Sequence, residues 1–140
     1  MDKIYSKQSK LTLRFNRDEE FIGELKQFCL KEKIQGGWFW GLGAISEAEL
    51  AFYNLTEKKY YSKVLSQPLE VASLSGNIGV KDNGLIVHCH GVFSNKDMQT
   101  FGGHVNKLVV AATLEVFLNV LPAINRQYSD EIGLNLLKQS

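Results

Sequence analysis

Apolar residues recur with two different periods in the first third of the chain. Between residues 11 and 15 they alternate with polar residues, which predicts a half-buried strand. They then return at helical spacing as far as about residue 33, which predicts the main helix. The positions that would form its buried face are Phe21, Ile22, Leu25, Phe28 and Cys29. We expect Asn16 or Asp18 to cap this helix and Gly36-Gly37 to end it.

From residue 38 onward the pattern is typical of a sheet. The predicted strands are 38–45, 49–55, 60–65, 69–78 and 85–93. Chain reversals are expected at residues 56–59 and at Asp82-Asn83-Gly84, and Pro68 is expected to interrupt the connection around it. The apolar run 108–120 fits a helix or a strand, and its β-branched residues favour a strand.

The remaining segment, 124–139, carries scattered apolar residues and is expected to pack on the body of the protein. One helix and about seven strands with short connections predict an α+β fold with a strongly curved, largely antiparallel sheet. The length of 140 residues suits one compact domain over 1–140 with a core of its own.

Composition and charge narrow the classes of function. With 44% apolar and 22% charged residues, the composition is that of a soluble globular protein. No signal peptide or membrane span is predicted, so we expect a cytoplasmic protein in which Cys29 and Cys89 are buried thiols. The net charge is +1, and the chain has only three arginines and no basic stripe. Direct binding to nucleic acid is therefore not favoured.

All three histidines lie within residues 88–104. Side chains two apart on a strand share a face, so His88 and His90 should point the same way and Cys89 the opposite way. A reversal centred near Asp97 would place His104 across from His90 on the neighbouring strand. Three imidazoles would then meet on one face of the sheet.

Three imidazoles are the ligands of a divalent-metal site with an open fourth position, and zinc is the expected ion. The alternative is that the histidines are structural residues satisfied by hydrogen bonds. A β-bulge at Gly102-Gly103 could also turn His104 away. We favour metal binding, because three neutral rings on one face have many polar atoms to satisfy and three charged rings would repel one another.

Other motifs give weaker signals. Residues 38–43, Trp-Phe-Trp-Gly-Leu-Gly, lack the spacing of a phosphate-binding loop, and Ser73 and Ser75 lack the surroundings of a nucleophile elbow. Glu70 and Glu115 stand in apolar surroundings, where we expect them to bond backbone or a subunit neighbour. The alternative is proton transfer near the metal. The many aromatic residues between 38 and 61 predict a subunit interface.

Five motifs in order along the chain carry a family resemblance: Gly41-Leu42-Gly43-Ala44-Ile45, the segment from Glu70 to Ile78, His88-Cys89-His90, Gly102-Gly103-His104 and Thr113-Leu114-Glu115-Val116. The chain resembles, over nearly its whole length, the PPC family, the "plants and prokaryotes conserved" domain. The resemblance implies a compact domain that assembles as a homotrimer. It also implies that the histidines match positions at which prokaryotic members look able to hold a metal.

In plants, the PPC domain follows AT-hook motifs with the core Arg-Gly-Arg-Pro, which contact DNA. This chain lacks that core and resembles the stand-alone prokaryotic form, which is commonly labelled DNA-binding by analogy. We therefore expect a trimeric binding or regulatory module that holds zinc, or a similar cation, through His88, His90 and His104. Its partner would be a protein or a small ligand at the metal.

Two alternatives remain open. The first is a zinc-dependent, hydrolase-type enzyme that uses metal-activated water, with Glu70, Glu115 or Asp97 transferring protons. The second is a protein that binds DNA directly.

Overall fold

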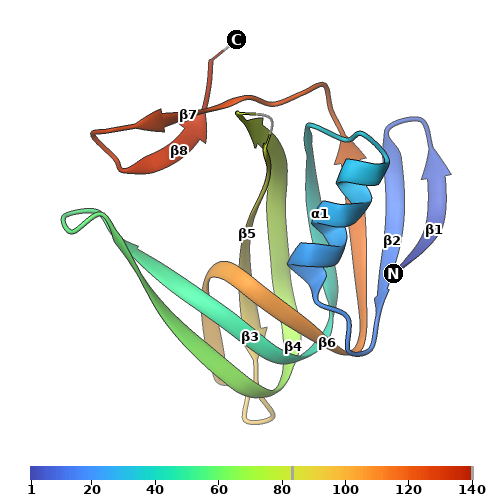
Figure 1. The fold of residues 1–140 in the computed structure, drawn as a ribbon. Helices are drawn as coiled ribbons and strands as arrows, with labels where there is room; N and C mark the ends of the chain where they lie inside the picture. Colours follow the sequence, from blue (N-terminus) through green and yellow to red (C-terminus); the bar gives the residue numbers. More distant parts are fainter. Residues whose placement is uncertain (83, 140) are drawn as a thin grey trace.

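The computed structural model describes residues 1–82 and 84–139, which form one helix and eight strands (Figure 1). In chain order these are β1 (Asp2–Lys7), β2 (Lys10–Asn16), α1 (Phe21–Lys31), β3 (Gly37–Asn54), β4 (Lys59–Lys81), β5 (Gly84–Ser94), β6 (Thr100–Val120), β7 (Arg126–Ser129) and β8 (Leu134–Leu137). The single compact α+β domain predicted from the sequence is confirmed.

Six strands form one sheet in the order β1-β2-β6-β3-β4-β5, and neighbouring strands in it are antiparallel. Strand β6 also pairs with β5, so β3, β4, β5 and β6 close on one another. A sheet can close in this way only if its strands bend strongly, and Figure 1 shows β3 and β4 curving away from the helix at one end. Strands β7 and β8 form a separate hairpin beside this sheet.

Helix α1 begins one residue after Glu20, which caps it. The Glu20 carboxylate accepts hydrogen bonds from the backbone N–H groups of Ile22 and Gly23, at 3.0 and 2.7 Å. The expectation that Asn16 or Asp18 caps the helix is wrong. Asp18 has a φ of 68°, in the left-handed region typical of a turn, so it belongs to the reversal before the helix.

The helix ends at Lys31, earlier than the sequence predicts. The backbone N–H of Ile34 bonds back to the Cys29 carbonyl at 2.8 Å, and Lys33 has a φ of 55°. This reversal turns the chain toward β3 and buries the Ile34 side chain in the core. Only 7% of the Ile34 surface stays exposed. Burial of Ile34 therefore outweighs continuation of the helical pattern.

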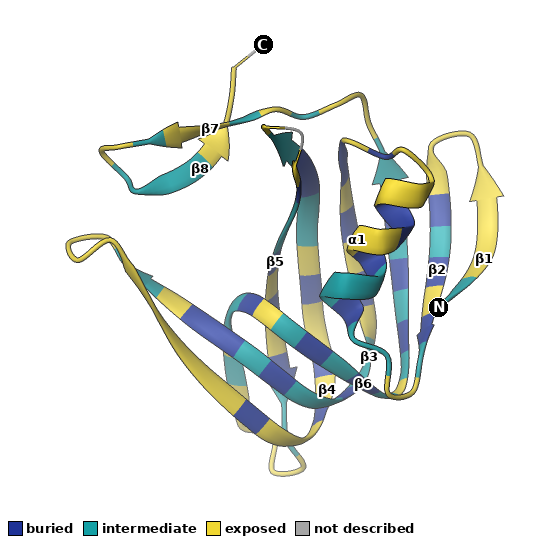
Figure 2. Cartoon of the chain, in the orientation of Figure 1, coloured by how far each residue is buried: buried dark blue, intermediate teal, exposed yellow. Residues whose placement is uncertain are grey.

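The apolar face of α1 packs against the sheet, as its dark bands in Figure 2 show. Phe21, Leu25, Phe28 and Cys29 are buried, as predicted. The Phe21 ring meets Phe15 of β2 and Phe39 of β3 edge to face, with centroids 5.0 and 5.8 Å apart. Each large apolar side chain buried here contributes about 1.5–3 kcal/mol, which holds the helix to the sheet.

The long strands β3 and β4 replace four shorter strands predicted from the sequence. Pro68, expected to interrupt the chain, lies inside β4. Ser66 pairs with Glu47 and Leu69 with Ile45, so β4 carries one more residue than β3 across this stretch. A proline lacks the N–H that a regular ladder needs, and a bulge is one of the few places in a strand that tolerates it.

Other expectations about the strands are largely met. The run 108–120 is a strand, and β6 begins earlier, at Thr100. Strand β1 escaped the sequence pattern because its side chains are mostly exposed and do not alternate. Lys81 pairs with Gly84 as a turn there requires, although Asn83, at its centre, lies outside the described residues.

The C-terminal segment packs on the body of the protein, as predicted. The backbone N–H of Val80 donates to the Ile124 carbonyl at 2.8 Å, and the Tyr53 hydroxyl donates to the Ile132 carbonyl at 2.7 Å. These bonds tie the β7–β8 hairpin to the ends of β3 and β4. In the described residues, no helix is both long and apolar enough to cross a membrane.

Candidate metal centre

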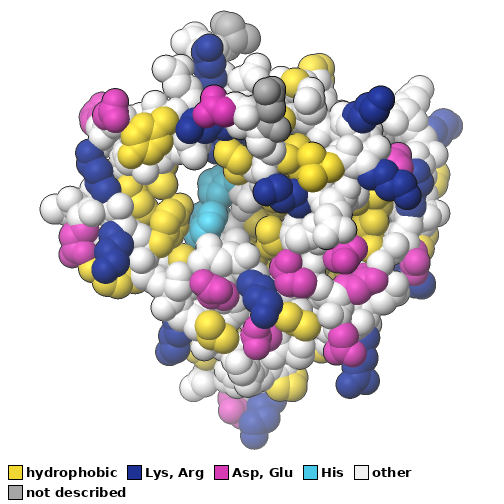
Figure 3. All heavy atoms as spheres, in the orientation of Figure 1, with side chains coloured by type: hydrophobic (Ala, Val, Ile, Leu, Met, Phe, Trp, Pro, Cys, Tyr) yellow, Lys and Arg dark blue, Asp and Glu magenta, His cyan; other side chains and the backbone are white. Residues whose placement is uncertain are grey.

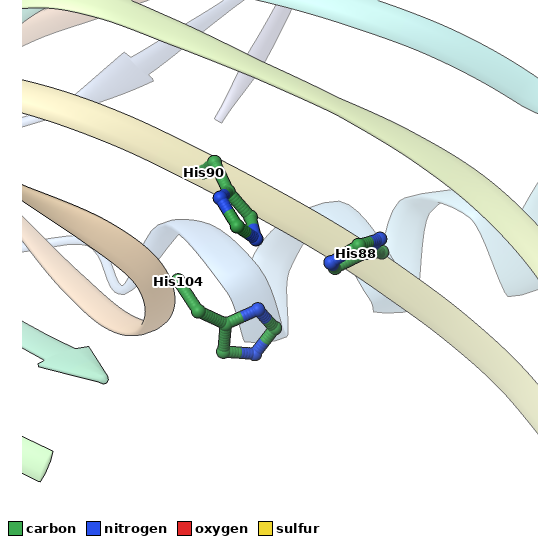
Figure 4. A group of neighbouring side chains, drawn as sticks. All are labelled: His88, His90 and His104. Atoms are coloured by element: carbon green, nitrogen blue, oxygen red, sulfur yellow. The ribbon is translucent and has the colours of Figure 1, made fainter. Parts of the chain in front are cut away.

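The three histidines come from two adjacent strands. His88 and His90 lie on β5, and His104 lies on β6 directly across from His90. The ladder continues without a shift through Gly91–Gly103 and Val92–Gly102. The bulge that could have turned His104 away is therefore absent from this part of the sheet. Figure 4 shows the three rings pointing toward one another.

Two glycines next to the histidines lie where a side chain would not fit. A Cβ at position 103 would lie 2.8 Å from the Ala51 carbonyl oxygen of β3, which is too close for a real side chain. A Cβ at position 91 would lie 2.5 Å from the Phe93 ring. Gly103 therefore lets β6 approach β3 next to His104, and Gly91 makes room for the Phe93 ring next to His90.

The spacing of the imidazoles suits a single cation. The ring centroids are separated by 5.1 Å for His88 and His90, 5.3 Å for His88 and His104, and 5.4 Å for His90 and His104. One nitrogen from each ring lies within 4.8 Å of the other two. A tetrahedral zinc ion with Zn–N bonds of about 2.0–2.1 Å separates its ligand atoms by about 3.3 Å. Small side-chain rotations would close this difference.

The surroundings keep two of the rings in the form that binds metal. Burial, followed by the nearby His104, His90 and Arg126, lowers the pKa of His88 to about 4. Burial and the nearby His90 also lower the pKa of His104. Both rings are therefore neutral at pH 7, with a lone pair free for a metal. The Nδ1 atom of His104 is buried without a hydrogen-bond partner among the described residues, a deficit that a bound cation would remove.

Cys89 lies between the two histidines of β5 but faces the core. Its side chain is fully buried, and burial raises the pKa of its thiol to about 12. Among the described residues, the group of possible metal ligands does not include Cys89. Cys29 is buried in the same way, so both cysteines are the core thiols predicted from the sequence.

The structure does not bring the candidate proton-transfer carboxylates to the histidines. Glu70 is exposed and pairs with Ser94, four residues beyond His90 and thus roughly 13 Å along the strand. Glu115 lies in the part of β6 that pairs with β2, and Asp97 is exposed in the β5–β6 turn. Among the described residues, the three-histidine group contains no carboxylate.

A cavity of about 520 Å³ opens beside the histidines, and His88 and His104 form part of its wall. Figure 3 shows imidazole atoms at the bottom of this hollow, with apolar side chains around it. Tyr60, Asn77 and Arg126 also line it, and the Tyr60 ring lies 5.1 Å from the His104 ring. Sequence reasoning missed these three residues. The alternation of Leu134 and Leu136 was the one available sequence signal that the C-terminal segment forms a wall of the cavity.

Comparison with known protein families identifies the family to which the chain belongs. The family model described as the Plants and Prokaryotes Conserved (PCC) domain matches residues 3–122. The chain belongs to the PPC family. This confirms the resemblance carried by the five sequence motifs. The PPC match includes all three histidines and ends before the β7–β8 hairpin.

Several solved structures are similar to this PPC protein. A presumed DNA-binding protein of Bacteroides thetaiotaomicron is 27% identical, with a TM-score of 0.92, over 96% of this chain and 94% of that one. A metal-containing protein of Archaeoglobus fulgidus is 28% identical, with a TM-score of 0.88, over 99% of each chain. A PPC protein of Pyrococcus horikoshii is 27% identical, with a TM-score of 0.87, over 100% and 98%. A comparison with curated proteins gives no match.

Proposed function

We propose that this PPC protein binds a divalent metal, with zinc as the expected ion, through His88, His90 and His104. The observation that carries the proposal is the group of three imidazole nitrogens within 4.8 Å of one another on one face of the sheet. Imidazole is a ligand that zinc accepts readily, and three protein ligands leave a coordination position open. The metal-containing relative from Archaeoglobus fulgidus supports the same conclusion.

We further propose that the protein acts as a cytoplasmic homotrimer and as a binding or regulatory module. Trp38 and Trp40 leave 48% and 44% of their surface exposed, and Trp40 stacks on Phe117 at 4.3 Å. Exposed aromatic residues of this kind are enriched at subunit interfaces. The trimer itself comes from the family resemblance.

Catalysis by metal-activated water is the second candidate, and the cavity beside His88 and His104 favours it. A bound zinc ion would lower the pKa of its water and supply a nucleophile. The three-histidine group nevertheless has no carboxylate among the described residues to accept a proton. We therefore place ligand binding before catalysis. Direct DNA binding, suggested by the name of the Bacteroides relative, ranks lower because the net charge is only +1.

Elemental analysis of protein purified without a histidine tag tests the metal centre. We expect about one zinc or similar ion per chain, and we expect the double variant His90→Ala, His104→Ala to lose it. Cys89→Ala is the matched control, because residue 89 lies between two ligands but faces the core. Wild-type protein that binds no ion after incubation with zinc, cobalt or manganese would refute the proposal.

A further inference from the structure

The cavity beside the histidines has two walls of different chemistry. Strands β4 and β5 supply one wall, with Asn77, Val87 and His88. The β7–β8 hairpin supplies the other, where Arg126 of β7 pairs across from Leu137 of β8 and Leu134 and Leu136 continue the wall. A volume of about 520 Å³ lies within the usual range for sites that bind small organic molecules.

Arg126 is held in a fixed orientation at the edge of this cavity. One terminal nitrogen donates to the Asn135 carbonyl at 2.7 Å, and the other donates to Asn77 Oδ1 at 2.5 Å. Its Nε is buried and has no hydrogen-bond partner among the described residues. A guanidinium carries five N–H donors, so the two bonds leave several donors for a ligand.

The positive charge of Arg126 also lacks a counter-charge. Both of its hydrogen bonds go to neutral oxygens, and none of the ion pairs among the described residues includes it. A cation that is partly removed from water and unpaired is costly, and an anion that enters the cavity would compensate for it. The metal proposed above would add positive charge on the same side.

The rest of the lining favours an apolar group. Leu134, Leu136 and Leu137 come from β8, and Ile86 and Val87 face them from β5. Leu136 and Leu137 keep 42% and 56% of their surface exposed, so a ligand that covered them would remove apolar surface from water. Positive charge beside a row of leucines describes a ligand in which a small anionic group is attached to an apolar group.

We propose that this cavity binds a small organic carboxylate with a short branched apolar chain. Arg126 and the metal hold the carboxylate, and the leucines of β8 cover the chain. The proposal rests on the metal centre proposed above and names the class of ligand that the centre accepts. A planar carboxylate matches a guanidinium fork, and its short apolar chain, which phosphate lacks, matches the leucines.

Calorimetric titration of the zinc-loaded protein with 4-methylpentanoate tests the proposal, and zinc is measured in the same sample. We expect binding at least tenfold tighter than that of 4-methylpentanamide, which lacks the charge, or of acetate, which lacks the chain. These comparisons use the wild-type protein, so they hold even if a variant fails to fold. Inorganic phosphate serves as the competing anion.

Two variants assign the charge recognition to Arg126. Arg126→Gln removes the guanidinium and should weaken 4-methylpentanoate binding at least tenfold. Asn77→Asp keeps an acceptor for the Arg126 bond at 2.5 Å but pairs the guanidinium with a carboxylate, so it should weaken binding by a similar factor while the hairpin stays attached. Zinc content should remain at the wild-type level in both variants, because neither residue is a proposed ligand.

The outcomes separate the two proposals. Full zinc content with 4-methylpentanoate bound no better than its amide or acetate would overturn the carboxylate site and leave the metal centre standing. Phosphate bound more tightly than 4-methylpentanoate would also overturn it. A wild-type sample that takes up no zinc would refute the metal centre, and with it the carboxylate site as stated.

Discussion

Protons and metal should compete at His88, and the competition should be visible in stability. In the unfolded chain, His88 takes up a proton near its ordinary pKa of about 6.5. In the folded, metal-free protein, burial and the nearby His104, His90 and Arg126 lower the pKa of His88 to about 4. Between these values the unfolded state binds more protons, so the free energy of unfolding falls as the pH drops from about 6.5 toward 4.

The size of this loss follows from the shift. One pKa unit corresponds to about 1.4 kcal/mol, so a shift from 6.5 to about 4 sets an upper bound of about 3.5 kcal/mol. His88 is only half-buried, and solvent screening reduces the expected loss to about 1–2 kcal/mol. The lowered pKa of His104 acts in the same direction.

Urea unfolding at pH 7 and pH 4.5, in the presence of a chelator, measures this loss. His88→Gln removes the titrating group while keeping a polar side chain of similar length. The lowered pKa values of Glu19 and Glu47 also make the fold less stable in acid, but they act equally in both proteins. We expect wild-type protein to lose about 1–2 kcal/mol more than His88→Gln over this pH range.

Zinc should stabilise wild-type protein more than His88→Gln at pH 7. A ligand at one hundred times its dissociation constant stabilises the folded state by about 2.7 kcal/mol. Wild-type protein should gain this amount, and His88→Gln should gain far less. Equal acid sensitivity of the two metal-free proteins would show that His88 is already solvated and protonated at its ordinary pKa, and the electrostatic account of the site would be wrong.

Three further predictions concern the core, the assembly and DNA. Cys89→Ala should leave zinc content unchanged and lower the free energy of unfolding by about 1 kcal/mol, because it removes a small buried side chain; loss of zinc would contradict the orientation of β5. Light scattering should give about three times the chain mass of 15.8 kDa, whereas a monomer at micromolar concentration would argue against the exposed tryptophans as an interface. Fluorescence anisotropy with random and A·T-rich duplexes should show Kd no tighter than roughly 10⁻⁵ M at physiological salt; submicromolar binding with a steep salt dependence would place DNA recognition first.

The histidine group was predictable because it depends on local rules. Alternation along β5 places His88 and His90 on one face, and a short reversal fixes the partner of His90. The buried face of α1 was predictable for the same reason, since its spacing is periodic. The Glu20 cap was not, because a glutamate that folds back on its own helix leaves no distinctive spacing in the sequence.

The surroundings of the histidines could not be predicted. Asn77 and Arg126 are 49 residues apart in the chain, and only the closed sheet and the docked hairpin bring them into contact. The continuous course of β4 past Pro68 depends on a bulge, whose position is set by pairing with a distant strand. Long-range pairing of this kind determines which side chains surround the histidines. The histidines themselves lie close together in the sequence.

The family match includes one wall of the cavity and ends before the other wall. The match ends at residue 122, whereas Arg126 and the leucines of β8 follow it. The histidines thus lie inside the family match, and the facing wall belongs to a hairpin that forms a two-stranded sheet of its own. Because it forms its own sheet, its sequence can change while the six-stranded sheet keeps its pairing. Grafting another hairpin after residue 122 should alter which molecules are admitted without rebuilding the sheet, so new selectivity could evolve or be engineered on an unchanged centre.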